Sequence, residues 1–360
     1  MKILNFPMIT IVATTTCNYS CYYCNPKGEG HSCEYGEIDP NLLSMLIKCA
    51  QSEGFHSFRL TGGEVTISKY FKKYCAVIFS AKKKGCYATM NTNGSSWEKL
   101  IPIFKEMPIN LIRISFDAID NTIFQKMSGS SNYSKVIEGI DMMLYHKIPI
   151  QINMVVTKSN FNNISKMIDF CKQRQINLKL LDYELGNKKT IDVWNNEFVN
   201  LQYLRNSLRN KYGSEGYFRT TGGYGMAMEV FKVDNIFIRI KDSTVSSTYH
   251  PTCISSCSLF PCPEGVFSLI VRPDRTITWC RRRKELSIPI GFSFKTIRNA
   301  LKSAIKTMNE CVEVWHDSLT PSETGVESIM TSEMIGKSAS QISNSLKIKG
   351  ISEIPRYDRC

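Results

Sequence analysis

The sequence predicts an α/β fold: a partial (β/α)6 barrel of the TIM type, followed by a cysteine-rich C-terminal module. Up to about residue 185, short β-branched apolar runs alternate with amphipathic stretches, which is typical of strand-helix units and a parallel sheet. Six such units are too few to close an eight-stranded barrel. Cysteines also gather at ligand-like spacing in two places, one near each end of the chain.

The strand-helix units can be placed in order along the chain. Strands are expected over Ile9 to Ala13, Ser57 to Leu60, Cys86 to Asn91, Leu111 to Phe116, Ile150 to Val156 and Leu178 to Tyr183. The first helix has a start signal, because Asp39 suits the N-cap and Pro40 the first helical position. Further helices are expected over Lys69 to Lys84, Glu98 to Glu106, Ser134 to His146 and Ile164 to Gln173. A functional site is expected where the strands end.

The regular alternation of strand-like and helix-like stretches ends after Gly186. A helical stretch over Glu197 to Lys211 precedes a glycine-rich segment TTGGYG, the strand-like run VFKVDNIFIRI and a cysteine block that ends at Cys280. We therefore expect a barrel core over 1–186 and a second module over 187–317. The remaining residues, 318–360, are rich in Ser, Thr and Glu and are expected to form a loosely held tail.

Composition narrows the class of protein. The 360 residues are 42% hydrophobic and 21% charged, so a core can be buried. No apolar run is long enough to span a bilayer and the start lacks a signal peptide, so we expect a cytoplasmic protein without membrane contact. The net charge of +13 favours an anionic partner, although an ordinary basic surface explains it equally well.

Three cysteines lie on one short loop directly after the first expected strand. Cys17, Cys21 and Cys24 follow the pattern C-x-x-x-C-x-x-C. Three thiolates can hold three irons of a cubane [4Fe-4S] cluster and leave the fourth iron open to another ligand. Catalytic metal sites keep such an open position. A zinc loop or three unrelated thiols are the alternatives.

Polar and glycine-rich segments end the next three strands. Thr61-Gly62-Gly63-Glu64 ends the second, Asn91-Thr92-Asn93-Gly94 the third and Ser115-Phe116-Asp117 the fourth. Two adjacent glycines let backbone carbonyl groups approach an ammonium group closely. Each segment alone is more often a turn or a cap.

The cysteine loop and these segments together resemble the radical SAM superfamily. The runs CNYSCYYCNP, FRLTGGE, TNG, IRISFDAID and INMVVTKSN resemble, in matching order, the GTP 3',8-cyclase of molybdenum cofactor synthesis. The resemblance implies a catalytic [4Fe-4S] cluster on the three cysteines. It also implies S-adenosyl-L-methionine as cofactor, cleaved to a 5'-deoxyadenosyl radical that abstracts hydrogen from a substrate. The residues implied to contact or position this cofactor are Tyr23, Gly62, Gly63, Glu64, Asn93 and Ser115.

The resemblance also bears on the substrate and on the electron donor, which is expected to be a flavodoxin or a ferredoxin. Arg59 and Lys158 stand where the cyclase uses basic residues on its nucleotide, although either could be an ordinary surface or strand-end charge. Thr16 replaces the arginine that precedes the first cysteine in the cyclase, and the cyclase's C-terminal Arg-x-Arg is absent. The sequence ends in Tyr-Asp-Arg-Cys where the cyclase has paired glycines. These departures argue against GTP cyclisation.

A second set of cysteines comprises Cys253, Cys257, Cys262 and Cys280. The stretch from Cys262 to Cys280 is predicted to be a β-hairpin that turns at Pro273-Asp274. It resembles the auxiliary-cluster hairpin of twitch or SPASM-type radical SAM enzymes, so we expect a second [4Fe-4S] cluster, with structural zinc as the alternative. A basic run, Arg281 to Lys284, follows and could steer an anionic substrate or be a solvated face.

The other cysteines and the function class remain to be assigned. Cys49, Cys75, Cys86, Cys171 and Cys311 are best interpreted as small buried hydrophobes, whereas Cys33 and Cys360 are unassigned. Three functions fit the sequence: a radical SAM enzyme acting on an anionic, nucleotide-like small molecule, a radical SAM peptide maturase, and a non-catalytic iron-sulphur sensor or nucleic-acid-binding protein.

Overall fold

Six parallel strands form the centre of the fold, and the sequence predicts all six to within one or two residues. The computed structural model describes residues 8–24, 36–184, 191–218, 224–243, 245–257, 260, 262 and 264–315. Its central strands are β1 (Met8–Val12), β2 (Ser57–Thr61), β3 (Tyr87–Thr92), β4 (Leu111–Ser115), β5 (Ile150–Val156) and β6 (Asn177–Asp182). They pair in this order, each parallel to the next. The predicted fold class is therefore confirmed.

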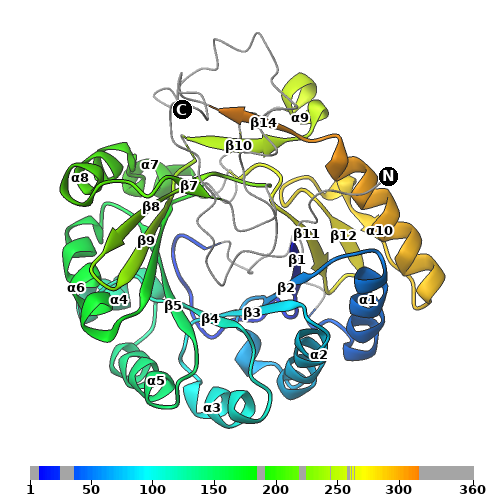
Figure 1. Cartoon of the computed structure of the whole chain (residues 1–360), viewed down its shortest axis with the longest axis horizontal. Coiled ribbons are helices and arrows are strands. Elements are labelled where there is room, and N and C mark those ends of the chain that lie inside the picture. The colour runs from blue at the N-terminus through cyan, green and yellow to red at the C-terminus, as the bar shows by residue number, and fades with distance from the viewer. Residues whose placement is uncertain are drawn as a thin grey trace.

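Helices connect these strands and cover the outside of the curved sheet (Figure 1). The expected helices are α1 (Pro40–Ser52), α2 (Phe71–Lys83), α3 (Trp97–Glu106), α5 (Tyr133–Tyr145) and α6 (Ile164–Arg174). The cap of α1 is as predicted, since the Asp39 carboxylate accepts from the N–H groups of Asn41 and Leu42 at 2.8 and 3.0 Å. A further short helix, α4 (Asn121–Ser128), was not expected. Single turns of 3-10 helix cover Val65–Ile67, Phe161–Asn163 and Lys284–Leu286.

Strands from the second half of the chain extend the same sheet. Its remaining elements are α7 (Ile191–Glu197), α8 (Gln202–Tyr212), β7 (Tyr217–Phe218), β8 (Met228–Val233), β9 (Ile236–Lys241), β10 (Ser246–Tyr249), α9 (Pro251–Ser256), β11 (Ser268–Arg272), β12 (Thr276–Thr278), β13 (Ile288–Pro289), α10 (Phe294–Asn309) and β14 (Val312–Trp315). In the described part of the chain the sheet has twelve strands in the order β13-β12-β11-β1-β2-β3-β4-β5-β6-β9-β8-β7. β9 pairs with β6, and β11 pairs with β1, both in parallel. β10 and β14 form a separate antiparallel pair.

For this second half, the structure contains the expected hairpin but changes the bounds of the expected helical stretch. The hairpin between Cys262 and Cys280 is present as β11 and β12, with its turn at Pro273 to Arg275. The helical stretch expected over Glu197 to Lys211 is present as α8 from Gln202 onward, but it is interrupted before that residue, because α7 ends at Glu197. The Asn200 side chain accepts from the Gln202 N–H at 2.8 Å, which competes with continuous helix at this point.

Side chains alternate between the two faces of each central strand. In β4, Ile112 and Ile114 belong to the hydrophobic core beneath the helices, whereas Arg113 between them does not. The same alternation holds in β2, where Phe58 and Leu60 join this core. Alternate residues of the central strands therefore face the concave side of the sheet.

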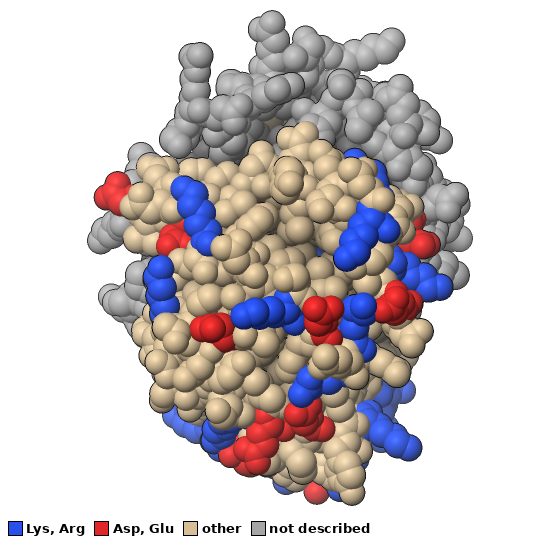
Figure 2. All heavy atoms as spheres, turned by 90° about the vertical axis from the view of Figure 1, so that its left-hand side faces the viewer, with Lys and Arg blue, Asp and Glu red and all other residues tan. Residues whose placement is uncertain are grey.

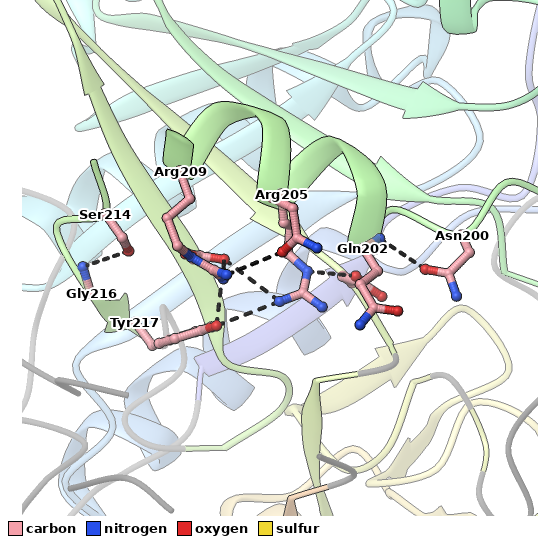
Figure 3. A network of polar contacts seen from close by, with 10 residues as sticks. Asn200, Gln202, Arg205, Arg209, Ser214, Gly216 and Tyr217 are labelled. Carbon is pink, nitrogen blue, oxygen red and sulfur yellow. Dashed lines mark hydrogen bonds and ion pairs between the residues drawn. The ribbon is translucent and has the colours of Figure 1, made fainter. Parts of the chain in front are cut away.

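Buried ion pairs join α8 to β8 and to the end of β9 (Figure 3). Glu229 and Asp242 are each 1% exposed. Arg205 contacts Asp242 at 2.8 Å and Glu229 at 3.6 Å, and Arg209 makes two bonds to Glu229 at 2.8 Å. The Tyr217 hydroxyl donates to Glu229 at 3.4 Å. Each buried charge in this network has an opposite charge beside it, as buried charges require.

Several expectations concern residues outside the described ranges. Cys33, Cys360, the expected tail 318–360 and the first part of TTGGYG lie there. Within the described ranges, no helix is both long and apolar enough to cross a bilayer.

We expect Glu229→Gln to lower the free energy of unfolding by about 3 kcal/mol, because it leaves two arginines beside an uncharged amide. Urea denaturation with circular dichroism measures this change. The control is Asp141→Asn, which breaks the more exposed pair with Arg174 and should cost less than about 1 kcal/mol. Equal losses in the two variants would contradict the importance of the buried network.

Candidate functional site

The N-terminal cysteine loop follows β1 at the edge of the sheet where the central strands end, and α4 anchors it. The Ser20 N–H donates to the Ser128 carbonyl at 3.0 Å, and the Tyr22 N–H donates to the Met127 carbonyl at 3.2 Å. The Cys21 thiol donates to the Ser128 carbonyl at 3.9 Å. The last carbonyls of a helix have no partner within the helix, so the loop satisfies them.

The three thiols of this loop influence one another electrostatically. Cys17 and Cys24 are exposed and Cys21 is half-buried. Burial raises the pKa of Cys21, and the negative charges of Asp117, Cys24 and Cys17 raise it further. The thiols do not converge as bound ligands would, since the described residues include no group of three Cys, His, Asp or Glu side chains with that arrangement. Three thiols on one loop are nevertheless the donor set that a cluster with one open iron requires.

The glycine pair after β2 packs against the segment that leads into Cys17. The Gly63 N–H donates to the Thr14 carbonyl at 2.7 Å, and the Glu64 N–H donates to the Thr16 carbonyl at 2.8 Å. A Cβ on Gly63 would lie 2.1 Å from the Thr16 oxygen, and one on Gly62 would lie 2.5 Å from the Thr14 oxygen. The groups that approach these glycines closely are therefore carbonyls of the protein's own backbone, at Thr14 and Thr16.

Glu64 ties the ends of β2 and β3 together. Its carboxylate is 1% exposed and accepts from the Thr66 N–H, the Thr66 and Thr92 hydroxyls, and the Asn93 N–H, at 3.0, 2.6, 2.8 and 2.6 Å. Burial raises the pKa of Glu64, and these hydrogen bonds oppose that rise. The carboxylate is thus engaged with four groups of its own chain.

Asn93 and Ser115 lie at the same edge of the sheet. The Asn93 amide donates to Asn18 Oδ1, within the cysteine loop, at 2.8 Å. Asn18 in turn donates to the Ser95 hydroxyl at 3.0 Å. Ser115 is exposed at the end of β4, beside Asn153 of β5 in the sheet register. The polar end of β3 therefore contacts the cysteine loop, and Ser115 ends the neighbouring strand at the same edge of the sheet.

Tyr23 is oriented by Asp117. Its hydroxyl donates to the Asp117 carboxylate, and its ring makes edge contacts with Tyr22 and Tyr183 at centroid distances of 5.7 and 6.3 Å. Asp117 also accepts from the Val155 N–H at 2.8 Å, and burial raises its pKa to about 6. Asp117 therefore fixes the aromatic residue beside the last cysteine.

Arg59 and Lys158 lie at different depths. Arg59 is half-buried in the middle of β2, between Thr10 and Thr89 in the register. Lys158 is exposed in the turn after β5, where its N–H donates to the Glu197 carbonyl at 2.8 Å. One cation thus lies within the sheet and the other at its edge.

Part of the second cysteine set comes together near the base of the β11-β12 hairpin. The pKa of Cys253 is raised to about 11, mainly by burial and in addition by the charges of Cys280 and Cys257. Cys262 accepts from the Gly265 N–H at 3.3 Å. Burial raises the pKa of both Cys262 and Cys280, and the charge of Glu264 raises both further. All four predicted cysteines therefore belong to one region.

Two features of this region could not be assigned from the sequence. Cys311, which follows α10, is buried as expected, but its pKa is raised by burial and then by the charge of Cys253, so it lies beside the second set. Arg282 and Arg283 are half-buried and lower the pKa of Cys262 and Cys253 respectively. The basic run thus lies against the cysteines and is not merely a solvated face.

The sequence matches known proteins over its first half. Residues 11–171 match the sequence model of the family described as the radical SAM superfamily. The chain therefore contains a radical SAM domain.

Similar proteins point to one group within this superfamily. A probable GTP 3',8-cyclase of Sulfurisphaera tokodaii is 29% identical over 164 residues, which are 45% of this chain and 51% of that protein. The GTP 3',8-cyclase of Clostridium acetobutylicum is 25% identical over 59% of this chain and 71% of its own length. The chain thus spans about half the length of the first of these relatives.

A solved structure shares the fold. The crystal structure of Streptococcus suis SuiB bound to S-adenosylmethionine aligns with a TM-score of 0.54 at 14% identity, covering 77% of this chain and 60% of that chain. The likeness extends past the six central strands, because the matched share exceeds the first half of the chain.

The anchorage of the cysteine loop can be tested at Gly129, the left-handed residue that ends α4 (φ 63°). A Cβ there would lie 2.1 Å from Ser20 Oγ. We expect Gly129→Ala to cost about 1 kcal/mol through backbone strain and, in addition, to reduce iron uptake by displacing the loop. Iron and sulphide assays after anaerobic reconstitution measure the second effect.

Gly85→Ala is the matched control, because Gly85 follows α2 with φ 83° in the hydrogen-bonded turn that ends the helix, and nothing lies within 4 Å of where its Cβ would be. It should show the same backbone strain and normal iron uptake. Normal iron in both variants would argue against anchorage through α4.

Proposed function

We propose that this chain is a radical SAM enzyme. It reductively cleaves S-adenosyl-L-methionine and abstracts hydrogen from an anionic, nucleotide-like substrate. The observation that carries the proposal is the loop of Cys17, Cys21 and Cys24, held against the glycine pair at the edge where the central strands end. The radical SAM domain at residues 11–171 supports it.

Each site residue has a role in this proposal. The three cysteines would hold a [4Fe-4S] cluster, which would supply the one electron that breaks a carbon–sulphur bond of the sulphonium cofactor. Gly62 and Gly63 keep the strand end close to the cysteine loop, and Glu64 holds that arrangement. Asn93 and the exposed Ser115 offer polar groups to the ribose and the carboxylate.

Aromatic side chains close the site on the side of the last cysteine. Tyr23 presents its ring to the adenine, with its hydroxyl retained by Asp117. Tyr22 is held by its hydroxyl, which donates to Glu197 at 3.3 Å and shares a hydrogen bond with the Thr157 hydroxyl at 2.9 Å. Rings that are fixed in this way exclude water from the reacting centre, which a primary radical requires.

The distribution of charge supports a small anionic substrate over a nucleic acid. On the face that Figure 2 presents, basic and acidic side chains alternate, so the excess of 45 basic over 32 acidic residues is not gathered there. Arg59 and Lys158 instead place cations within and at the edge of the barrel. A nucleotide or a similar phosphate or carboxylate compound fits these positions.

The second cysteine set supports an auxiliary [4Fe-4S] cluster, and with it the alternative of a peptide maturase. Cys253, Cys257 and Cys280 lie within electrostatic reach of one another, and Cys262 shares Glu264 with Cys280. Neighbouring Arg282 and Arg283 favour the thiolate forms that iron binds. A flavodoxin or ferredoxin would deliver the electron, and the exposed Cys17 and Cys24 leave the catalytic cluster accessible to it.

The proposal predicts that Cys24→Ala abolishes 5'-deoxyadenosine formation from S-adenosylmethionine under dithionite. Reconstituted wild-type protein should carry about eight iron and eight sulphide, and Cys24→Ala about four of each, because only the catalytic cluster is lost. Chromatography of the nucleoside and iron analysis measure the two effects. The control is Cys171→Ala, a buried cysteine in α6 that should keep full iron and activity. Normal 5'-deoxyadenosine from Cys24→Ala would refute the proposed function.

We further predict that the enzyme does not convert GTP to the 3',8-cyclised product. Thr16, which is exposed beside the first cysteine, and the stretch from Phe267 to Ile270 stand where the resemblance would place the cyclase's nucleotide-binding arginines. Each lost charge-assisted contact should cost about 1.5 to 3 kcal/mol, and every 1.4 kcal/mol weakens binding about tenfold. Mass spectrometry after incubation with GTP, cofactor and reductant tests this, with the Clostridium acetobutylicum cyclase run alongside. Comparable turnover by the two enzymes would show the prediction to be wrong.

A further inference from the structure

The concave face of the sheet carries polar side chains at positions that are buried from solvent. Thr89, Arg113, Gln151 and Arg239 lie on β3, β4, β5 and β9, and each is at most 4% exposed. They alternate with residues of the hydrophobic core, such as Ile112 and Ile152, which face the helices. The inner positions of these strands thus hold two buried guanidinium groups.

Among the residues that the structure describes, Arg113 has no partner for its charge. No hydrogen bond or ion pair joins its side chain to the rest of the described chain, and its Nη1 is fully buried without a partner. Its direct neighbours in the register are Asn91 and Gln151. The Gln151 Oε1 already accepts from Arg239 Nη1 at 3.4 Å, and the Gln151 amide donates to Asn153 at 2.8 Å.

The side-chain oxygen of Asn91 likewise lacks a hydrogen-bond partner among the described residues. The Asn91 Oδ1 is buried and accepts no hydrogen bond from the described part of the chain. An unused acceptor therefore lies beside an unused cationic donor. A ligand that pairs with both side chains must supply acceptor oxygens to Arg113 and an N–H or O–H donor to Asn91.

Another buried arginine of this protein shows how such a charge is compensated. Arg205 is 3% exposed and contacts both Asp242 and Glu229. Arg113 is equally buried and faces neutral amides. Since a guanidinium cannot lose its proton in a protein, the charge of Arg113 has to be compensated by something other than these neighbours.

We infer that Arg113, assisted by Arg239 and Asn91, forms an oxyanion-binding subsite inside the barrel. Arg113 precedes Ser115 by two residues on β4, so the subsite lies about 7 Å along the strand from the expected cofactor site. The occupant is a phosphate or carboxylate group with a neighbouring hydrogen-bond donor. The inference rests on the proposed function in one respect, because the oxyanion is taken to belong to the substrate.

Binding of small oxyanions to the full reconstituted chain tests the subsite without cofactor or reductant. Pyrophosphate and succinate are titrated separately at constant ionic strength. Their binding is measured by isothermal titration calorimetry and by the change in melting temperature. One of the two should bind the wild-type protein, which distinguishes a phosphate from a carboxylate occupant. Arg113→Met should weaken that binding at least about tenfold, the loss of one charge-assisted contact. It should not lower the melting temperature of the ligand-free protein, because a buried uncompensated charge is removed.

Two further variants complete the test. Arg174→Met removes an arginine from the outer surface of α6 and should leave oxyanion binding unchanged. Arg113→Lys keeps the charge but not the two-pronged geometry, so it should bind more weakly than wild type. This variant decides the matter if Arg113→Met does not fold.

Three results would overturn the inference: no binding of either anion to the wild-type chain, unchanged affinity in Arg113→Met or Arg113→Lys, and a lowered melting temperature of Arg113→Met with unchanged binding. The proposed function fails separately, through absence of 5'-deoxyadenosine from the wild-type enzyme. Oxyanion binding that depends on Arg113 in a protein that does not cleave the cofactor would keep the subsite and reject the function.

Discussion

The hydrogen bonds to the buried Glu64 carboxylate are the constraint on which the candidate site depends. They join the end of β2, the following 3-10 turn and the end of β3, and Asn93 continues the chain of contacts to Asn18 in the cysteine loop. A carboxylate removed from water requires such partners, since burial alone raises its pKa and favours the neutral form. The satisfied charge therefore fixes three backbone segments together, and the cysteines take their place relative to the strand ends from that arrangement.

The two faces of the central strands carry different side chains: the outer face stabilises the fold, and the inner face lines the barrel. The outward positions are apolar and pack against the helices, as Phe58 and Ile114 do, so burial of hydrocarbon on that side stabilises the fold. The interior of a closed TIM barrel is also filled with branched apolar side chains. Here the inner positions hold Thr89, Arg113 and Gln151 instead. A buried polar lining reduces stability unless it is compensated, and such a lining is retained where a ligand completes it.

The sequence predicts best those features that depend on local signals. The six strands and α1 follow from apolar periodicity and from Asp39 and Pro40, and the cysteine spacing identifies the loop after β1. The short helix α4 carries its own signals, Asp120 as N-cap and Gly129 as C-cap, but eight residues give too weak a period. Contacts between distant segments are not encoded locally. The anchorage of Ser20 on α4, the position of Cys311 beside Cys253 and the addition of β11 to β1 are of this kind.

The pairing of β11 with β1 also determines how the two cysteine sets are arranged. The strands are parallel, so the N-terminal cysteine loop lies at the edge where both end. β12 runs antiparallel to β11, so Cys280, two residues after β12, lies at the edge where β1 and β11 begin. Five-residue strands separate these edges by roughly 13 to 17 Å. The inner positions that carry Arg59 and Arg113 lie between the two edges. A substrate held there would have one cysteine set at each end, so under the proposed function the lining of the barrel, more than its outer surface, would select the substrate.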